Sequence, residues 1–114
     1  MDLPDASETA EISVEELRTL LDADQVRLID CREEDGYHLC RIEGATLIPL
    51  QQIPEKIEAV SGEGDRPVVI YCHHGMRSLN ATQFLRARGL EQTFSLRGGI
   101  EAWSLTVDPE VPRY

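Results

Sequence analysis

The sequence predicts an α/β domain built on a parallel sheet with helices on both faces. Short apolar segments rich in branched residues alternate along the chain with segments whose apolar residues recur at helical spacing. The run at residues 67–72 is the clearest strand, and it lacks the polar alternation of a strand with one solvated face. The length of 114 residues corresponds to one domain.

The first eleven residues are acidic and aperiodic, and we expect them to form a flexible lead-in (residues 1–11) to a domain that spans residues 12–114. Ser13 and Glu16 have the spacing of a capping box, so they predict the start of a helix. The expected helical stretches contain residues 17–21, 33–40, 53–60, 78–88 and 100–105. The expected strands are residues 26–30, 46–48, 67–72 and 93–96. The expected loop is residues 61–65, and the two prolines of the tail, residues 108–114, prevent it from being helical throughout.

The composition excludes several classes of partner. The 11 Lys and Arg residues against 21 Asp and Glu residues give a net charge of -10, whereas nucleic acids and anionic membranes bind basic faces. No apolar run approaches the ~20 residues of a membrane span, and residues 1–5 show no secretory signal. The three cysteines form no CxxC pair, which favours reduced thiols in the cytoplasm without a metal or cofactor.

The turn after the strongest strand carries the candidate chemistry. Cys72 ends the strand and Arg77 opens the next helix, so the backbone N–H groups between them can curl around an anion. Gly75 permits backbone angles that a side chain would forbid, and Arg77 adds a permanent positive charge. Because the field that holds an anion also stabilises a thiolate, the pKa of Cys72 should lie below its ordinary value. The turn is therefore predicted to hold a thiolate or a persulfide.

Three other segments accompany this turn. Residues 28–33 read LIDCRE, residues 42–49 read IEGATLIP and residues 96–103 read LRGGIEAW. Together with CHHGMRS at residues 72–78, they resemble, in the same order, the motifs of the rhodanese-like single-domain sulfurtransferases. The tail, residues 108–114, is also similar to the end of rhodanese modules fused to the adenylyltransferases that sulfurylate molybdopterin synthase.

The resemblance implies a three-layer fold with a central parallel sheet of five strands flanked by helices. It implies a thiosulfate sulfurtransferase, in which Cys72 takes sulfane sulfur from thiosulfate or a persulfide donor. The Cys72 persulfide would pass that sulfur to cyanide, a thiol or a partner protein, without a cofactor. The implied catalytic residue is Cys72, the implied substrate-binding loop is His73, His74, Gly75, Met76 and Arg77, and the implied supporting residues are Asp30, Arg32 and Ser78.

The sequence is also compatible with three other functions. A cysteine phosphatase or arsenate reductase also sets a thiolate and an Arg over an anion cradle, but typically with five residues between them, where this chain has four. A binding module could use the fold without turnover, although such modules often lack the cysteine. A persulfide carrier for one pathway, such as sulfur-cofactor biosynthesis, would keep the chemistry and turn over thiosulfate slowly.

Two pairs of residues near the loop have alternative roles. Asp30 and Arg32 are either a simple strand-end ion pair, of little energetic value if exposed, or groups that position the loop. We favour the positioning role. His73 and His74 either add charge and protons near the substrate or point to solvent. We favour solvent.

The two other cysteines also have alternative roles. Cys31 stands where the family often has Val, and we expect it to fill the core. The alternative is a resolving thiol that attacks a persulfide on Cys72. Cys40 is expected to be an exposed thiol. The absence of paired ligand spacing argues against a zinc site built from these cysteines.

Overall fold

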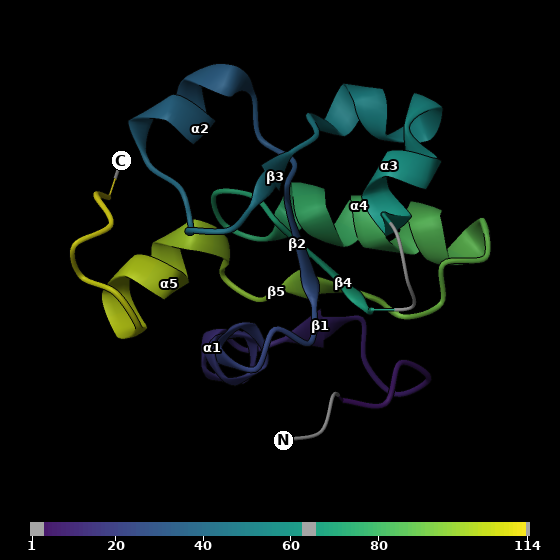
Figure 1. The fold of residues 1–114 in the computed structure, drawn as a ribbon, viewed down its shortest axis with the longest axis horizontal. Coiled ribbons are helices and arrows are strands. Elements are labelled where there is room, and N and C mark those ends of the chain that lie inside the picture. The colour runs from purple at the N-terminus through teal and green to yellow at the C-terminus, as the bar shows by residue number, and fades with distance from the viewer. Residues whose placement is uncertain (1–3, 63–65, 114) are drawn as a thin grey trace.

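The computed structural model describes residues 4–62 and 66–113, and its centre is a five-stranded sheet in the order β1-β5-β4-β2-β3 (Figure 1). The strands are β1 (Glu11–Ile12), β2 (Arg27–Asp30), β3 (Thr46–Leu47), β4 (Val68–Tyr71) and β5 (Thr93–Leu96). The helices are α1 (Val14–Asp22), α2 (Glu34–Leu39), the 3-10 helix η1 (Leu50–Glu55), α3 (Ile57–Ser61), α4 (Met76–Ala87) and α5 (Gly99–Thr106). All four strand pairs are parallel. The predicted α/β fold with a five-stranded parallel sheet is confirmed.

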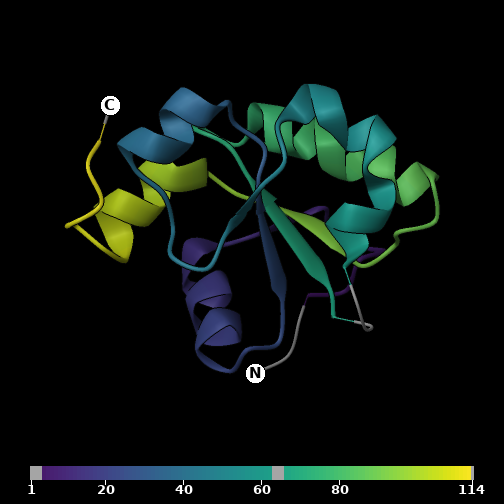
Figure 2. The ribbon, with the colours of Figure 1, turned by 45° about the horizontal axis from the view of Figure 1, so that its top comes forward.

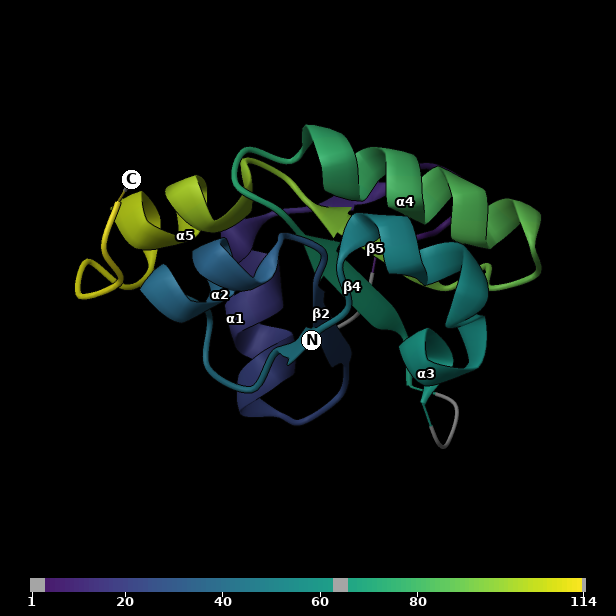
Figure 3. The same ribbon diagram turned by 90° about the horizontal axis from the view of Figure 1, so that it is seen from above.

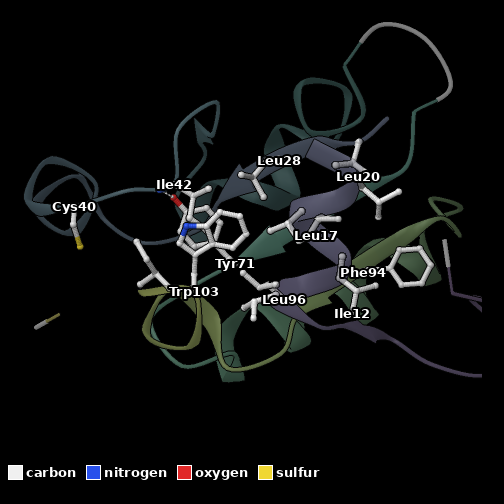
Figure 4. Packing of buried hydrophobic residues seen from close by; sticks show 14 residues of the cluster. Ile12, Leu17, Leu20, Leu28, Cys40, Ile42, Tyr71, Phe94, Leu96 and Trp103 are labelled. Carbon is white, nitrogen blue, oxygen red and sulfur yellow. Dashed lines mark hydrogen bonds between the residues drawn. The ribbon is translucent and has the colours of Figure 1, made fainter. Parts of the chain in front are cut away.

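Helices cover both faces of the sheet, and each face has its own apolar cluster. α1 and α5 lie on one face, whereas α4, η1 and α3 lie on the other (Figures 2 and 3). The α1 cluster (Figure 4) consists of Ile12, Val14, Leu17, Leu20, Val26, Leu28, Cys40, Ile42, Val69, Tyr71, Phe94, Leu96, Ile100 and Trp103. The α4 cluster consists of Ile29, Cys31, Ile48, Ile53, Val60, Val68, Ile70, Cys72, Ala81 and Leu85.

The side chains of β4 alternate between these two clusters. Val68 and Ile70 belong to the α4 cluster, whereas Val69 and Tyr71 belong to the α1 cluster. All four are buried, which confirms that helices cover both faces of this strand. Cys72 continues the alternation just beyond the strand, so its thiol lies on the α4 side of the sheet.

The predicted capping box is present at the start of α1. The Ser13 hydroxyl accepts from the Glu16 N–H at 3.0 Å, and the Glu16 carboxylate accepts from the Ser13 N–H at 2.8 Å. These two bonds satisfy backbone donors that the first turn leaves without an intrahelical acceptor. The helix therefore begins where the sequence predicts.

Two helical segments differ from the prediction. In place of one helix over residues 53–60, η1 and α3 are separated at Lys56. Pro54 lies inside η1, and its ring prevents the α-helical bond to the carbonyl four residues earlier, which favours the tighter 3-10 form. The helix expected from Ser78 begins instead at Met76, directly after Gly75.

Strand β1 is not predicted by the sequence, because a two-residue strand shows no periodicity. The segment before it is tied to the domain by hydrogen bonds. The Ser95 N–H donates to the Ala10 carbonyl at 2.8 Å. The Arg86 guanidinium donates to the carbonyls of Ala6 and Thr9 at 2.7 and 2.9 Å. The segment thus runs beside β5.

The division into a lead-in (residues 1–11) and a domain (residues 12–114) stays a prediction. Residues 1–3, 63–65 and 114, which belong to the expected lead-in, loop and tail, lie outside the described residues. Within the described ranges, no helix has the length and apolar character needed to cross a membrane.

Candidate active site

Cys72 lies at the carboxyl end of β4, at the start of the turn that leads into α4. Gly75 is the N-cap residue of α4 and has a φ of 103°. A Cβ at Gly75 would stand 3.2 Å from the Gly98 nitrogen and 3.3 Å from the Leu96 carbonyl oxygen. Glycine at this position therefore suits both the left-handed backbone and the close approach of the chain after β5.

The turn surrounds the Cys72 sulfur with hydrogen-bond donors. The N–H groups of Gly75 and Ser78 donate to Sγ at 3.1 and 3.4 Å. The Ser78 hydroxyl oxygen lies 3.4 Å from the same sulfur. Because Cys72 is only 2% exposed, these groups take the place of water around a negative charge. The turn forms the anion cradle that its sequence predicts.

A buried serine that the sequence analysis does not single out supports this cradle. The hydroxyls of Ser78 and Ser95 lie 2.7 Å apart, and the Ser78 hydroxyl oxygen lies 3.3 Å from the Gly75 carbonyl oxygen. Ser95 is fully buried in β5. A hydroxyl residue in the middle of an expected strand of a sheet that helices cover on both faces was the available signal, since a buried hydroxyl needs a partner.

The LRGGIEAW segment orients the turn from its other side. The N–H groups of Ile100 and Glu101, in the first turn of α5, donate to the carbonyls of Cys72 and His73 at 3.0 and 3.1 Å. A Cβ at Gly99 would stand 2.4 Å from the Cys72 carbonyl oxygen. Because Gly99 has no side chain, α5 approaches closely enough to donate hydrogen bonds to these two carbonyls. With the carbonyls engaged there, the N–H groups of the turn are the backbone groups that face the Cys72 sulfur.

Hydrogen bonding lowers the pKa of Cys72 well below its ordinary value. The largest cause is a hydrogen bond from the Cys31 side chain, followed in the same direction by the Ser78 hydroxyl and the N–H groups of Ser78 and Gly75. Burial opposes these effects. The Cys31 pKa is raised, first by its hydrogen bond to Cys72 and then by burial. Cys72 is therefore the thiolate of the pair and Cys31 the thiol. The lowered pKa was predicted, but its largest cause was not.

Asp30 and Arg32 form a buried ion pair, not an exposed one. The Arg32 Nη2 lies 2.6 Å from Asp30 Oδ2, and the two residues are 1% and 0% exposed. The same Nη2 donates to the Cys40 carbonyl, and the Arg32 guanidinium lies 5.5 Å from the centre of the Tyr71 ring. The pair thus fixes the end of α2 against the sheet, on the face opposite the Cys72 thiol.

The expectation of an exposed Cys40 is wrong. Cys40 is 6% exposed and belongs to the α1 cluster. Its burial follows from the Arg32 contact with its carbonyl, which draws the end of α2 onto the core. Cys31 is fully buried in the α4 cluster, as its expected place in the core requires.

The other loop residues lie nearer the surface. Arg77, His74 and Met76 are exposed and His73 is half-buried. The rings of His73 and His74 stack with centroids 3.9 Å apart. Arg77 and Leu39 help line a depression of about 460 Å³ between α2 and the start of α4. The structure thus brings Gly75, Ser78 and Cys31 to the sulfur and leaves Arg77 at the rim.

Among the described residues, no group of three or more His, Cys, Asp or Glu side chains is placed to hold a metal ion.

The chain belongs to the Rhodanese-like domain family, whose sequence pattern matches residues 13–106. Thiosulfate sulfurtransferase GlpE of Shewanella oneidensis is 33% identical over 92 residues, which cover 81% of this chain and 89% of that protein. The probable adenylyltransferase/sulfurtransferase MoeZ of Mycobacterium tuberculosis is 34% identical over 120 residues, which cover 99% of this chain and 29% of MoeZ. The rhodanese-like/PpiC domain-containing protein 12 of Arabidopsis thaliana is 31% identical, and this chain spans 37% of its length.

Solved structures agree with the family assignment. The human single-domain sulfurtransferase TSTD1 superposes with a TM-score of 0.74 at 26% identity, covering 86% of this chain and 97% of that one. A rhodanese-related protein of Thermoplasma volcanium gives a TM-score of 0.78 at 27% identity, covering 91% and 98%. The predicted family and its three-layer fold are therefore confirmed.

Proposed function

We propose that the chain is a sulfurtransferase that carries sulfane sulfur on Cys72, between thiosulfate or a persulfide donor and a thiophilic acceptor. The observation that carries this proposal is the Cys72 sulfur, buried at the end of β4 and hydrogen-bonded by the N–H groups of Gly75 and Ser78. Its lowered pKa keeps it a thiolate near neutral pH, and the thiolate is the form that attacks sulfur.

In the first half-reaction, the Cys72 thiolate attacks the outer sulfur of thiosulfate. A bond forms between Sγ and that sulfur, the sulfur–sulfur bond of thiosulfate breaks, and sulfite leaves with the bonding electron pair. The product is a Cys72 persulfide whose charge lies mainly on the outer sulfur. The Met76 and Arg77 N–H groups, which have no intrahelical acceptor in the first turn of α4, are suited to hold that charge.

In the second half-reaction, an acceptor such as cyanide attacks the outer sulfur. The bond between this sulfur and Sγ breaks, thiocyanate leaves, and the Cys72 thiolate is restored in its cradle. The exposed Arg77 guanidinium can attract both anionic substrates to the mouth of the site. Asp30 and Arg32 take no direct part in the transfer, since their charges satisfy each other on the opposite face of the sheet. Their role is to position the end of α2.

The surface around the loop favours one second candidate, a persulfide carrier that receives sulfur from a protein. Met76 is 73% exposed and Leu39 is 56% exposed, and Leu39 lines the depression beside Arg77. Two large exposed apolar side chains next to the reactive loop suit a protein partner better than a small anion. A carrier would use the same Cys72 persulfide, with slow turnover of thiosulfate.

The proposal is tested by following sulfur on each cysteine. Trypsin, which cuts after Arg and Lys but not before Pro, separates the cysteines onto residues 28–32, 33–41 and 57–77. The protein is mixed briefly with thiosulfate, quenched with an alkylating reagent and digested. One added sulfur on the peptide 57–77, and thiocyanate formation when cyanide is supplied, are the expected results. The Cys40→Ser variant is the control and should behave like the parent.

The same experiment distinguishes the alternatives. Sulfur on Cys72 from a cysteine-desulfurase persulfide, with little from thiosulfate, would assign the chain as a carrier. An unmodified Cys72 with both donors, together with hydrolysis of an aryl phosphate, would replace the proposal with a phosphatase. The cytoplasmic location stays a prediction.

A further inference from the structure

Cys31 and Cys72 are neighbours across the carboxyl ends of two adjacent strands. In the parallel pairing of β2 with β4, Asp30 stands opposite Tyr71. The Cys31 N–H donates to the Tyr71 carbonyl at 3.0 Å, so the pairing continues one residue beyond the strands. Cys31 and Cys72 are therefore the next residues in register.

The two thiols also lie on the same face of the sheet and contact each other. Both belong to the α4 cluster, at 0% and 2% exposure, and their side chains are hydrogen-bonded. Neighbouring strands run about 4.7–4.9 Å apart, and disulfides join Cα atoms about 4.4–6.8 Å apart. Cys40 lies in the α1 cluster, across the sheet. The geometry thus permits one disulfide at the site, between Cys31 and Cys72.

We propose that Cys31 is a resolving thiol, which attacks the Cys72 sulfur once that sulfur carries a leaving group and closes a Cys31–Cys72 disulfide. The leaving group that matters most is the sulfane sulfur of the Cys72 persulfide, so the proposal rests on the proposed function. Its consequence is a further activity of the same site, the release of hydrosulfide when no acceptor arrives.

The resolving step needs no external oxidant. The Cys31 sulfur forms a bond with Cys72 Sγ, and the bond between Sγ and the sulfane sulfur breaks. The sulfane sulfur leaves with the electron pair and takes up the Cys31 proton, giving one hydrosulfide ion from the anionic persulfide. The two cysteine sulfurs are oxidised to a disulfide, and the sulfane sulfur is reduced by the same two electrons.

The arrangement explains why Cys31 would not interfere before sulfur is bound. While Cys72 is a thiolate, Cys31 donates its proton to it and remains an unreactive thiol. Adding a sulfur moves the negative charge one atom outwards, which weakens the hold on the Cys31 proton and makes Sγ electrophilic. The positive end of α4 lies beside Cys72 and can stabilise the departing hydrosulfide.

Burial restricts the reaction to this pair. Cys31 is fully buried, so the partner within its reach is the sulfur with which it is in register. The disulfide would block the nucleophile, and a small dithiol or a dithiol protein would be needed to restore it. The dithiol undergoes thiol–disulfide exchange with the Cys31–Cys72 disulfide and leaves as its own disulfide. One dithiol therefore reduces the disulfide of one chain.

The test supplies thiosulfate without acceptor or thiol, then measures hydrosulfide, intact mass and tryptic peptides over time. The parent should release close to one hydrosulfide per chain, lose two hydrogens and link peptides 28–32 and 57–77. Cys31→Ser keeps a hydroxyl that can donate to Cys72 but has no sulfur. Its persulfide should persist, with hydrosulfide release at least about tenfold slower, because the attacking thiol is gone. Cys40→Ser should match the parent.

The outcomes separate this inference from the proposed function. A parent persulfide as long-lived as that of Cys31→Ser, with no linked peptides, overturns the resolving role and leaves the sulfurtransferase intact. If thiosulfate and a desulfurase persulfide both leave Cys72 unmodified, the proposed function fails. Hydrogen peroxide then still decides the role of Cys31, because it converts the Cys72 thiolate to a sulfenic acid. Cys31 should resolve this acid to the same disulfide with loss of water. Absence of that disulfide would overturn the inference.

Discussion

The two faces of the sheet, at its carboxyl edge, stabilise negative charge by different means. On the α4 face, the Cys72 sulfur accepts from neutral groups: the N–H groups of Gly75 and Ser78, and the Cys31 thiol. On the other face, the Asp30 carboxylate lies in direct contact with the Arg32 guanidinium. Neutral donors stabilise a buried anion and leave it nucleophilic, whereas a counter-ion at hydrogen-bonding distance neutralises the charge of the anion.

This difference suits the α4 face to the proposed chemistry and the other face to stability. Both groups are buried, so exposure does not distinguish them. The nature of the partner distinguishes them. A carboxylate paired with a guanidinium has its charge neutralised, whereas a thiolate bound by neutral donors can still attack a substrate sulfur. Four changes to the protein test this contrast.

The largest effect is expected from Cys72→Ser, which should abolish sulfur transfer. A serine alkoxide is inaccessible near pH 7, and oxygen cannot form the persulfide. The smaller hydroxyl fits the same donors, so the circular dichroism spectrum should be unchanged. Thiocyanate formation from thiosulfate and cyanide measures the loss. Substantial activity in this variant would show that Cys72 does not carry the sulfur.

On the opposite face, Arg32→Met should destabilise the fold by about 3–5 kcal/mol, because it leaves the Asp30 carboxylate buried without its counter-ion. Urea unfolding measures the change in free energy. The matched control is Arg66→Met, since Arg66 forms a pair of similar length, 2.8 Å, with Asp24, at 44% and 89% side-chain exposure. That loss should cost less than about 1 kcal/mol. Equal losses would show that burial does not set the value of these pairs.

The next change lengthens the turn itself. One glycine inserted between Gly75 and Arg77 should widen the cradle and lengthen the contacts of 3.1 and 3.4 Å between the Gly75 and Ser78 N–H groups and Sγ. A net hydrogen bond to a charged group is worth about 1.5–3 kcal/mol. Losing one or two should slow sulfur transfer roughly tenfold to thousandfold or more, at about 1.4 kcal/mol per decade.

The control for this insertion lies at the other end of α4. A glycine inserted between Gly89 and Leu90 lengthens an exposed turn far from Cys72, and transfer should be close to that of the parent. The parent itself should show no appreciable hydrolysis of an aryl phosphate. Faster phosphate hydrolysis than sulfur transfer would mean that the four-residue turn does not exclude phosphatase chemistry.

Most of the fold follows from local patterns in the sequence. The apolar run of β4, the capping box at Ser13 and the glycines at the starts of α4 and α5 are short-range signals, and each marks its element. Two of the failures have long-range causes. β1 exists because its backbone pairs with β5, and the burial of Cys40 depends on a contact from Arg32.

The candidate site divides in the same way. The turn from Cys72 to Ser78 could be predicted because the sulfur and the N–H groups that donate to it come from one short stretch of the chain. The contact between Cys31 and Cys72 joins the residues that directly follow two different strands, and it depends on the β2–β4 register. The sequence suggests a resolving thiol as an alternative but gives no distance between the two sulfurs. The hydroxyl pair of Ser78 and Ser95 depends in turn on the meeting of α4 with β5.

The smallest expected effect comes from Ser78→Ala, which removes one neutral donor from the thiolate and keeps the backbone N–H. The Ser78 hydroxyl lowers the pKa of Cys72, so its loss should raise that pKa. A hydrogen bond to a charged group is worth about 1.5–3 kcal/mol, and sulfur at 3.4 Å is a weak acceptor. The lower end of that range corresponds to about one pH unit.

The measurement is the rate at which Cys72 is alkylated in the folded protein at a series of pH values. The extent of alkylation is read from peptide 57–77 after digestion. The thiolate reacts, so the rate falls as the pH drops through the Cys72 pKa. In the parent this midpoint should lie well below the free-thiol value of about 8.5. Ser78→Ala should move it upwards, and Cys31→Val should move it further, because the Cys31 hydrogen bond is the larger cause. Ser104→Ala, which removes a buried hydroxyl bonded to the Val111 carbonyl, should leave the midpoint in place.

A midpoint that stays fixed in both Ser78→Ala and Cys31→Val would mean that the backbone N–H groups and the end of α4 hold the thiolate alone. The neutral side chains on this face would then support the fold, as the ion pair does on the other.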